Sequence, residues 1–467
     1  MNARSDRTAP TADRIAVRVP GGRSHPIRPV ATLLGALVGL ALATGARAEG
    51  PDLCEGLVTH NERVAVKPVK RPPFMKRYRD PAFGTTVMRI TDSRVGTVRK
   101  PVYSTIQAWN ADESLLMLYQ SGGGRSGHFL VDGHTYEFVR NVDFVPADLE
   151  EVWWSHTDPD VFYYVSQYKQ DLGEFKRYSV KAGAAETVRD FKEECGEGVM
   201  PVAGGDVHMP PLDDDLFGFR CKRKDGSWIA LTWKPSTDEV HTMPIGDGTD
   251  YNEWYAPMPG PSGKRVWFQG DVLTPDLKTV ERSMDMAKTD EHSNVGTTAE
   301  GHDALFQTVF DPSPKGCDDD IRQGVAHLTE FDLEDASCRP IISESQGYPY
   351  TTSGTHVSAQ AWKRPGWVLM SSIGNDFKWF ENGRKAPALF SEIYLANTDP
   401  DDPVTCRLAQ HRSFGKHAER GDYNAYFGEP HATISPSGTR MVFGSDWYDS
   451  GMVDTYVIEL PSYDPKS

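Results

Sequence analysis

A weak internal repeat constrains the fold of this chain more than any other feature of its sequence. The clearest copy spans residues 429–447, where a short apolar segment, a Ser-Pro-Ser-Gly turn and a second alternating segment follow one another. Proline presets the backbone for such a turn, and glycine supplies its left-handed position. Related units begin near residues 107, 154, 208, 256, 302, 356 and 431, at intervals of 46 to 75 residues. A four-stranded propeller blade needs about 40–50 residues, so seven blades would fill most of the chain.

The copies differ in how much of this pattern they keep, and those that begin at His302 and His356 lack the turn residues. No stretch shows a sustained helical stripe of apolar residues. We therefore predict an all-β, seven-bladed propeller of four-stranded blades. A strand at 85–90 precedes the first unit, and residues 453–460 form the last strand. We expect the N-terminal strand to complete the last blade as its outer strand, which would hide the sheet edges and lock the ring.

The N-terminal 48 residues differ in character from the rest. Arg23 and Arg28 precede an apolar run at 30–44, and a small-x-small pattern at 46–48 ends it. This order is typical of a secretory signal peptide, and the apolar run is short for a membrane span. An uncleaved N-terminal anchor is the alternative. We predict a signal peptide at 1–48, an N-terminal extension at 49–84 and the propeller at 85–467, in a periplasmic or secreted protein without a membrane span once the signal is removed.

The charge balance restricts the partners of the predicted mature protein. The whole chain has a net charge of −16, and the predicted signal peptide contains seven Arg and two Asp, so its removal would leave −21. So acidic a surface argues against binding nucleic acid or anionic membranes. An anionic substrate would need a local cationic site. We expect a monomer.

Six cysteines remain after residue 48, an even number that fits disulfides in an exported protein. Among the fifteen connectivities possible for six cysteines, we predict the two pairs that are close in sequence, Cys195–Cys221 and Cys317–Cys338. No C-x-x-C spacing indicates a zinc site.

The starts of the repeat units point to a functional centre. The first strand of each propeller blade lies innermost, so its first residues meet at one face of the ring. Imidazoles and a carboxamide there can bind Mn²⁺, Ca²⁺ or Zn²⁺, act as general bases, hydrogen-bond a sugar, or simply satisfy buried groups. At these positions the sequence places Gln107, His302, His356 and His431 as candidate ligands of a divalent metal, and His208 as a candidate catalytic residue.

Other residues are assigned to the same face as weaker candidates. The segment 397–428 is long for a connection between blades, and long loops often carry function. Within or beside such loops we assign catalytic roles to Arg364 and His411, and substrate binding to Arg412, Tyr426 and Glu429. Trp154, at a blade start, is a further substrate-binding candidate. Glu429 or Asp303 could also supply a carboxylate ligand, and His292 should flank the mouth.

The Ser-Pro-Ser-Gly-Thr-Arg-Met-Val-Phe unit at 435–443 resembles the blades of TolB-like propellers. An exported seven-bladed ring with histidines at blade starts also resembles the oligogalacturonate lyases and other propeller polysaccharide lyases. This resemblance implies a divalent metal held by three His and one Gln, with a Gln-x-x-His-x-His arrangement in the last blade. Residues 426–431 read Tyr-Phe-Gly-Glu-Pro-His here, and only His431 matches that arrangement.

Three functions are compatible with these features. The first is a lyase that degrades uronic-acid-containing polysaccharides or oligosaccharides by β-elimination, with a cation neutralising the uronate carboxylate and a base removing the C5 proton. The second is a non-catalytic periplasmic propeller that binds or scaffolds envelope proteins. The third is another metal-dependent hydrolase or metal-binding propeller. Elemental analysis of the purified protein would separate the second from the others.

Overall fold

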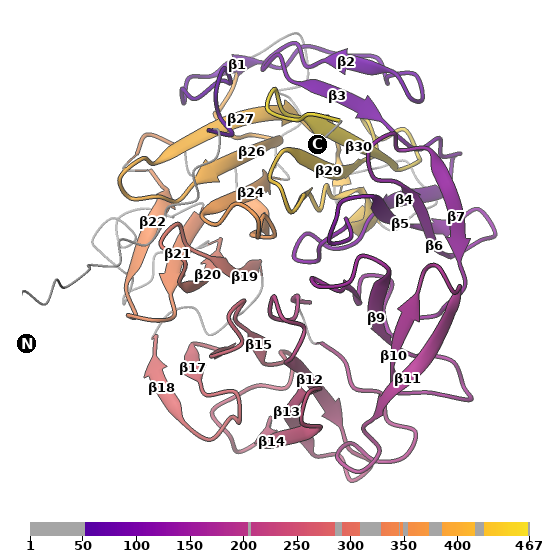
Figure 1. Cartoon of the computed structure of the whole chain (residues 1–467). Helices are drawn as coiled ribbons and strands as arrows, with labels where there is room; N and C mark the ends of the chain where they lie inside the picture. The colour runs from indigo at the N-terminus through magenta and orange to yellow at the C-terminus, as the bar shows by residue number, and fades with distance from the viewer. Residues whose placement is uncertain are drawn as a thin grey trace, which may run out of the picture. The chain divides into compact units, whose positions relative to one another are not determined.

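Seven β-sheets form a ring in this protein (Figure 1). The computed structural model describes residues 52–203, 207–284, 292–308, 328–344, 346–348, 354–372, 385–415 and 425–465. Within these ranges the chain is almost entirely strand and turn, with one short 3-10 helix, η4 (Ala425–Gly428). Five of the seven sheets contain four strands, as predicted.

The first three blades follow one another along the chain. Blade 1 contains β4 (Thr97–Pro101), β5 (Leu115–Gly122), β6 (Gly127–Asp132) and β7 (Phe138–Val142). Blade 2 contains β8 (Val152–Trp154), β9 (Val161–Val165), β10 (Glu174–Ser179) and β11 (Ala184–Asp190). Blade 3 contains β12 (Phe217–Lys222), β13 (Trp228–Lys234) and β14 (Glu239–Ile245), and Val202 bridges to Arg220 on the inner side of β12.

The next three blades continue the ring in the same order. Blade 4 contains β15 (Met258–Pro259), β16 (Val266–Phe268), β17 (Asp271–Leu273) and β18 (Val280–Ser283). Blade 5 contains β19 (Ser293–Thr297), β20 (Asp303–Gln307), β21 (Leu328–Asp332) and β22 (Cys338–Ile342). Blade 6 contains β23 (Gly354–Ser358), β24 (Trp367–Ser372), β26 (Glu392–Asn397) and β27 (Val404–Gln410).

Blade 7 joins the two ends of the propeller. Its strand order from the outside is β2 (Arg77–Arg79), β3 (Thr86–Arg89), β30 (Asp454–Glu459), β29 (Arg440–Ser445) and β28 (Thr433–Ile434). β3 pairs antiparallel with β30, which confirms that an N-terminal strand closes the ring. β2 adds a fifth strand that the sequence pattern did not predict. Because this pairing links the first part of the propeller to its last blade, the ring has no open edge between blades 7 and 1.

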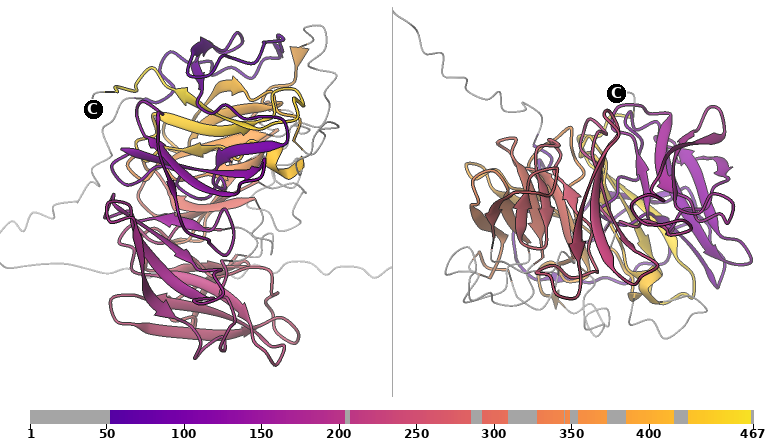
Figure 2. Two further views of the ribbon diagram at one scale, coloured as in Figure 1. Left: turned by 90° about the vertical axis from the view of Figure 1, so that its right-hand side faces the viewer. Right: turned by 90° about the horizontal axis from the view of Figure 1, so that it is seen from below.

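Figure 2 shows the ring of blades from the side and from below, and the hydrophobic core lies between neighbouring blades. Along the inner strands side chains are buried on both faces, because each sheet is covered by a blade on either side. Five tryptophans fill this space and are almost fully buried: Trp109, Trp153, Trp154, Trp233 and Trp267. Large rings suit these inter-blade layers because each removes a wide apolar area from water.

The N-terminal extension lies against blade 6. β1 (Val64–Ala65) pairs with β25 (Lys385–Ala386), and Cys54 forms a disulfide with Cys406 in β27. The fully buried Arg407 pairs with Glu392 and donates to the carbonyl oxygen of Glu62, so the extension covers this ion pair. These contacts fix the extension to the propeller over a large sequence separation.

The second disulfide, Cys195–Cys221, is one of the two predicted pairs and is confirmed. In the other predicted pair, Cys317 lies outside the described residues, and Cys338 is not a free thiol. The predicted signal peptide also lies outside the described residues, so the predicted domain boundaries stay predictions. No helix in the described part of the chain is both long and apolar enough to span a bilayer.

Candidate functional site

The site forms where the innermost strands begin. All innermost strands run in the same direction through the ring, so their first residues lie at one face, here called the start face. His356 lies within β23, and His431 lies two residues before β28. Lys100 lies in β4, Glu150 lies two residues before β8, and His292 lies one residue before β19. Five blades therefore each place a titratable side chain at this face.

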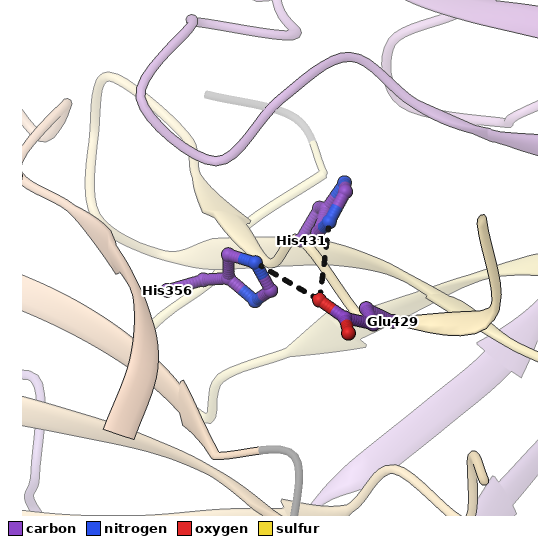
Figure 3. A group of neighbouring side chains, drawn as sticks. All are labelled: His356, Glu429 and His431. Carbon is purple, nitrogen blue, oxygen red and sulfur yellow. Dashed lines mark ion pairs between the residues drawn. The ribbon is translucent and has the colours of Figure 1, made fainter. Parts of the chain in front are cut away.

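Three of the buried side chains at the start face converge on one point (Figure 3). Nε2 of His356 lies 3.5 Å from Oε2 of Glu429, and Nε2 of His431 lies 3.9 Å from the same oxygen. One donor atom from each of the three residues lies within 4.8 Å of the others. The two imidazole rings meet edge to face, with centroids 4.3 Å apart. This arrangement is compact enough for all three groups to contact one small ligand.

The donors of this triad suit a divalent cation. Nδ1 of His356 and Nε2 of His431 are buried and have no hydrogen-bond partner among the described residues. Buried polar atoms rarely lack partners, so each such atom calls for an explanation. Two imidazoles and one carboxylate are a common ligand set for Zn²⁺ and suit Mn²⁺ as well. Burial and the neighbouring His431 hold the pKa of His356 well below its usual value, so its ring is neutral, the form that binds metals.

A second layer of polar groups surrounds His431. Nζ of Lys100 lies 2.7 Å from Nδ1 of His431 and donates to the carbonyl oxygen of Glu429 at 3.1 Å. Oε1 of Glu150 lies 3.4 Å from the same nitrogen of His431. Tyr119 and Tyr426 each donate their hydroxyl to Glu150, at 3.1 and 2.9 Å. His431 is thus held between a cation and a carboxylate that is itself fixed by two phenols.

Burial and charge act in opposite directions in this layer. Burial lowers the pKa of Lys100 to about 8, although Glu150 and Glu429 favour its charged form. Burial works against the ionised form of Glu150, but the hydrogen bond from His431, together with the charges of His431 and Lys100, holds its pKa at about 2. Burial beside Glu150 raises the pKa of Tyr426, so its hydroxyl stays protonated and remains a donor.

Below the triad, the centre of the ring is closed by amide side chains. Gln107 donates to the carbonyl oxygens of Gln360 and Ile434, each at 3.0 Å. Asn294 accepts from the Ala359 amide at 2.7 Å and from the Gln360 side chain at 3.0 Å. These bonds join blades 1, 5, 6 and 7 across the axis. Gln107, predicted as a metal ligand, is therefore part of the floor of the site, and its amide nitrogen is already committed to two carbonyl groups.

His302 and Arg364 lie at the opposite ends of their hairpins from the start face. The Gly301 amide donates to Thr298 O, and Asp303 pairs with Thr297, so His302 lies in the turn immediately before β20, the second strand of blade 5. The expectation that His302 starts an innermost strand is wrong, because blade 5 starts at β19. His302 pairs with Asp332 at 2.6 Å. Arg364 lies in the turn between β23 and β24, beyond the far end of the strand that carries His356.

His208 and His411 are both buried, and none of their described hydrogen bonds reaches the triad, although His411 lies near enough to His356 to help lower the pKa of that ring. Both ring nitrogens of His208 lack a hydrogen-bond partner among the described residues, and burial lowers its pKa to about 3. His411 contacts Ser372 O through Nε2 at 2.6 Å and accepts from the Ser413 amide at Nδ1. Because both nitrogens of His411 are used by the backbone, this ring is poorly suited to transfer a proton.

Of the predicted substrate-binding residues, some lie at the site and others are buried away from it. Tyr426 is 37% exposed and its ring lies 4.7 Å from that of His431, so it stands at the mouth of the site beside Glu429. Trp154 is buried and donates to Ala108 O at 3.1 Å, which places it in the core between blades. Arg412 is fully buried and pairs with Asp80 at 3.0 Å, so it anchors the N-terminal extension.

Lys100 and Glu150 belong to the site but were not identified from the sequence. Neither lies in a motif, and both precede the apolar segments from which the repeat was aligned. His292 was assigned only to a flanking loop, yet its ring lies 5.8 Å from that of His356. Counting residues backward from each predicted turn to the start of the preceding innermost strand would have identified Lys100, Glu150 and His292.

The fold has solved counterparts, although no protein-family model matches the sequence and no curated protein matches it either. One similar structure is an oligogalacturonate lyase in complex with manganese, with 15% identity and a TM-score of 0.56. That alignment covers 83% of this chain and 96% of the lyase. An oligogalacturonate lyase from Vibrio parahaemolyticus shares 13% identity at a TM-score of 0.57, with 83% and 97% covered. At this identity the likeness establishes the seven-bladed propeller fold that the sequence predicted, and the resemblance to TolB-like blades stays a prediction.

Proposed function

We propose that this chain is an exported lyase that cleaves uronic-acid-containing oligosaccharides or polysaccharides by β-elimination at the start face. The observation that carries this proposal is the buried convergence of His356, Glu429 and His431 beside Lys100. The similarity in fold to two oligogalacturonate lyases supports the reaction class. The disulfides Cys54–Cys406 and Cys195–Cys221 fit an oxidising compartment outside the cytoplasm.

His356, Glu429 and His431 would hold a divalent cation, which when bound would supply positive charge against the uronate carboxylate and so make the C5 proton more acidic. The chain itself orients these ligands. Lys100 binds the carbonyl oxygen of Glu429, and Lys100 and Glu150 both face Nδ1 of His431. Partners of this kind fix the orientation of a ligating imidazole. The amide floor at Gln107 keeps the site closed on its inner side.

β-Elimination requires a base that removes the C5 proton while the electron pair forms the C4–C5 double bond and the glycosidic C4–O bond breaks. We assign the base to an imidazole nitrogen of His292, because His292 begins blade 5 at the start face and lies next to His356. Imidazole is the side chain best matched to proton transfer near neutral pH. Tyr426, exposed at the mouth with its hydroxyl held by Glu150, would position the sugar chain.

The direct test is to incubate the purified protein with a panel of uronate oligomers and follow the ultraviolet absorbance of unsaturated products. We expect activity with at least one uronate, its loss after chelation, and its recovery with Mn²⁺. The same signal should vanish in H356A, H431A and H292A. H302A is the matched control, because it removes an imidazole that lies outside the triad.

Two results would overturn the proposal. The first is the absence of unsaturated product with every uronate, with and without Mn²⁺ or Ca²⁺. The second is full activity in H431A, because the proposed site loses one of its three ligands in that variant.

A further inference from the structure

A second hollow lies between the last and first blades, away from the amide-floored centre. It has a volume of about 370 Å³, within the usual range of small-molecule sites. We call this hollow the rim cleft. Its walls come from the segments before β2 and after β3, from β4, β5, β6 and β7, and from the turns between β5 and β6 and between β6 and β7. The residues that carry the argument are Phe74, Arg99, Gln120, Arg125, Phe138 and Asn141.

Two phenylalanines stand exposed in this cleft. Phe74 is 46% exposed and Phe138 is 62% exposed, and Phe138 packs against Phe129 with ring centroids 6.3 Å apart. Exposed aromatic rings in a cleft offer flat apolar faces to a ligand, and the C–H faces of sugar rings fit such surfaces. The rim cleft therefore has the apolar platform of a carbohydrate site.

Two arginines add a cationic side to the same cleft. Arg99 is held by Gln120 Oε1 at 2.9 Å and by the carbonyl oxygen of Asp92 at 3.2 Å, and these bonds use Nε and one terminal nitrogen. The other terminal nitrogen has no hydrogen-bond partner among the described residues and can donate to a ligand. Arg125 is exposed and forms no ion pair with any residue in the described ranges. The guanidinium of Arg99, held by Gln120 and Asp92, is therefore preorganised to bind a carboxylate.

The negative charge in the cleft is already compensated. Asp92 contacts Arg89 at 2.8 Å and Arg71 at 3.7 Å. The cleft therefore presents a net positive wall in a chain whose net charge is −16. The side-chain amides of Gln120 and Asn141 complete a set of donors and acceptors that can bind hydroxyl groups. The chemistry that matches this wall is an anionic sugar.

We propose that the rim cleft is a second binding site for an acidic oligosaccharide, with a uronate carboxylate at Arg99 and Arg125 and a sugar ring against Phe74 and Phe138. The choice of a uronate rests on the proposed lyase function. Arg99 and Lys100 are consecutive in β4, so their side chains point to opposite faces of blade 1. Lys100 reaches the triad and Arg99 reaches the cleft, which places the two sites on either side of one strand.

The test measures binding of trigalacturonate to the full mature chain by calorimetry, in an H356A/H431A background that removes the central ligands. We expect one remaining site, a loss of about tenfold in affinity in R125A and in F138A, and no binding of maltotriose, which lacks the carboxylates. K224A, which removes an exposed cation from a hairpin of blade 3, is the matched control and should bind as its parent does. Unchanged thermal unfolding in R125A and F138A shows that these variants are folded.

The outcomes separate this inference from the lyase function. Equal affinity in R125A, F138A and K224A would overturn the rim cleft, as would equal binding of maltotriose, and both would leave the lyase assay unaffected. Binding that is lost in R125A while no uronate is cleaved would support the cleft and overturn the lyase. Concentration-dependent self-association that is abolished in F138A, with no sugar binding, would mean that a second copy of this chain covers the cleft and would also overturn the proposal.

Discussion

Each innermost strand begins at the start face and ends at the turn to the second strand of its blade, here called the turn end. Both ends carry buried polar side chains, but these differ in whether their hydrogen-bonding atoms have partners. At the turn end, the carboxylate of one blade accepts hydrogen bonds from the turn of the blade before it. Glu113 accepts from the Ser437 amide at 2.8 Å, Asp214 from Ser155 Oγ at 2.6 Å, and Asp303 from the Ser262 amide at 2.9 Å. At the start face, by contrast, nitrogen atoms of His356 and His431 have no hydrogen-bond partner among the described residues.

This difference separates structural polar groups from functional ones. A buried group that is fully bonded fixes the position of its neighbours and has little left to offer a ligand. A buried group that lacks a partner costs stability unless a ligand satisfies it. The turn end thus holds the blades together, and the start face has unused donors and acceptors. Variants at the two ends should therefore affect different measurements.

The largest expected effect is on activity at the start face. H431A removes one of three ligands, and we expect lyase activity to fall roughly a thousandfold or more, because a cation at such a site contributes several kcal/mol to transition-state stabilisation. Metal content should fall with it, as measured by elemental analysis. H302A should keep both. H431A removes a buried contact of Lys100 and Glu150 but also a nitrogen without a partner, so it should cost less stability than the turn-end variant E113A. A larger loss of stability than in E113A, together with retained metal, would remove the distinction between the two ends.

The next effect is on stability at the turn end. Arg440 is 1% exposed and pairs with Glu113 at 2.6 Å. E113A would leave this cation without its carboxylate, and we expect a loss of about 3–5 kcal/mol in the free energy of unfolding, measured in urea. E137A, at an exposed position in the same blade, should change it by less than about 0.5 kcal/mol. The activity of the folded fraction of E113A should equal that of the wild type.

The two ends should also lose stability in different pH windows. Burial lowers the pKa of His128, near Tyr119 at the start face, to about 4, so its contribution is complete above 6.5 and is lost as the pH falls from 6.5 toward 4. The loss should reach about 3 kcal/mol at pH 4. Burial opposes the ionised form of Glu113, but its bond to Arg440 keeps its pKa below the usual value, so its contribution is lost only below about 4.5.

Urea unfolding at a series of pH values tests these windows. H128Q should make the pH dependence between 6.5 and 4 shallower, with the other buried histidines His208, His356 and His411 supplying the rest, whereas E113Q should change it only below about 4.5. H60Q, at an exposed position, is the control for a change of histidine. Identical slopes for H128Q and the wild type in the upper window would show that His128 does not carry this dependence.

The smallest effect is expected for a single turn hydroxyl. Ser262 Oγ donates to Asp303 at 2.5 Å, and S262A should cost about 1 kcal/mol in the free energy of unfolding. The exposed pair Ser227–Asp225, at 2.7 Å, offers a matched change, and S227A should have almost no effect because water replaces the lost bond. Equal effects of the two substitutions would mean that the buried turn-end hydrogen bond contributes no more to stability than an exposed one.

Features at the turn end were easier to predict from the sequence than features at the start face. The Ser-Pro-Ser-Gly turn at 435–438 and its relatives could be found because turn chemistry is local and repeats at a blade-sized interval. His356, His431 and Glu429 were predicted for the site and do lie together. The start of blade 5 was placed one strand too late, so His302 was assigned to the innermost strand although it lies just before the second strand, because this blade lacks the turn residues that set the alignment. A slip of this size moves a residue to the other end of a hairpin.

The remaining site residues depend on contacts that no local pattern records. Lys100 and His431 are 331 positions apart and meet only because blades 1 and 7 are neighbours in the closed ring. Cys54–Cys406 joins residues 352 positions apart because the N-terminal extension packs against blade 6. Short spacing favoured Cys195–Cys221, which is correct, but short spacing carries no information about a disulfide that ties an extension to a distant blade.

The sequence by itself determined the all-β class, the seven units, the closing N-terminal strand and the face on which to look for chemistry, because strand alternation and turn residues act over a few neighbouring positions. The tertiary structure alone decided which histidines meet, that Lys100 and Glu150 flank them, and that Gln107 closes the floor. Those outcomes depend on strand register and on which blades lie side by side, and a shift of one residue reverses the direction of a side chain. The fold is therefore encoded locally, whereas the site exists only where the ring brings distant strands together.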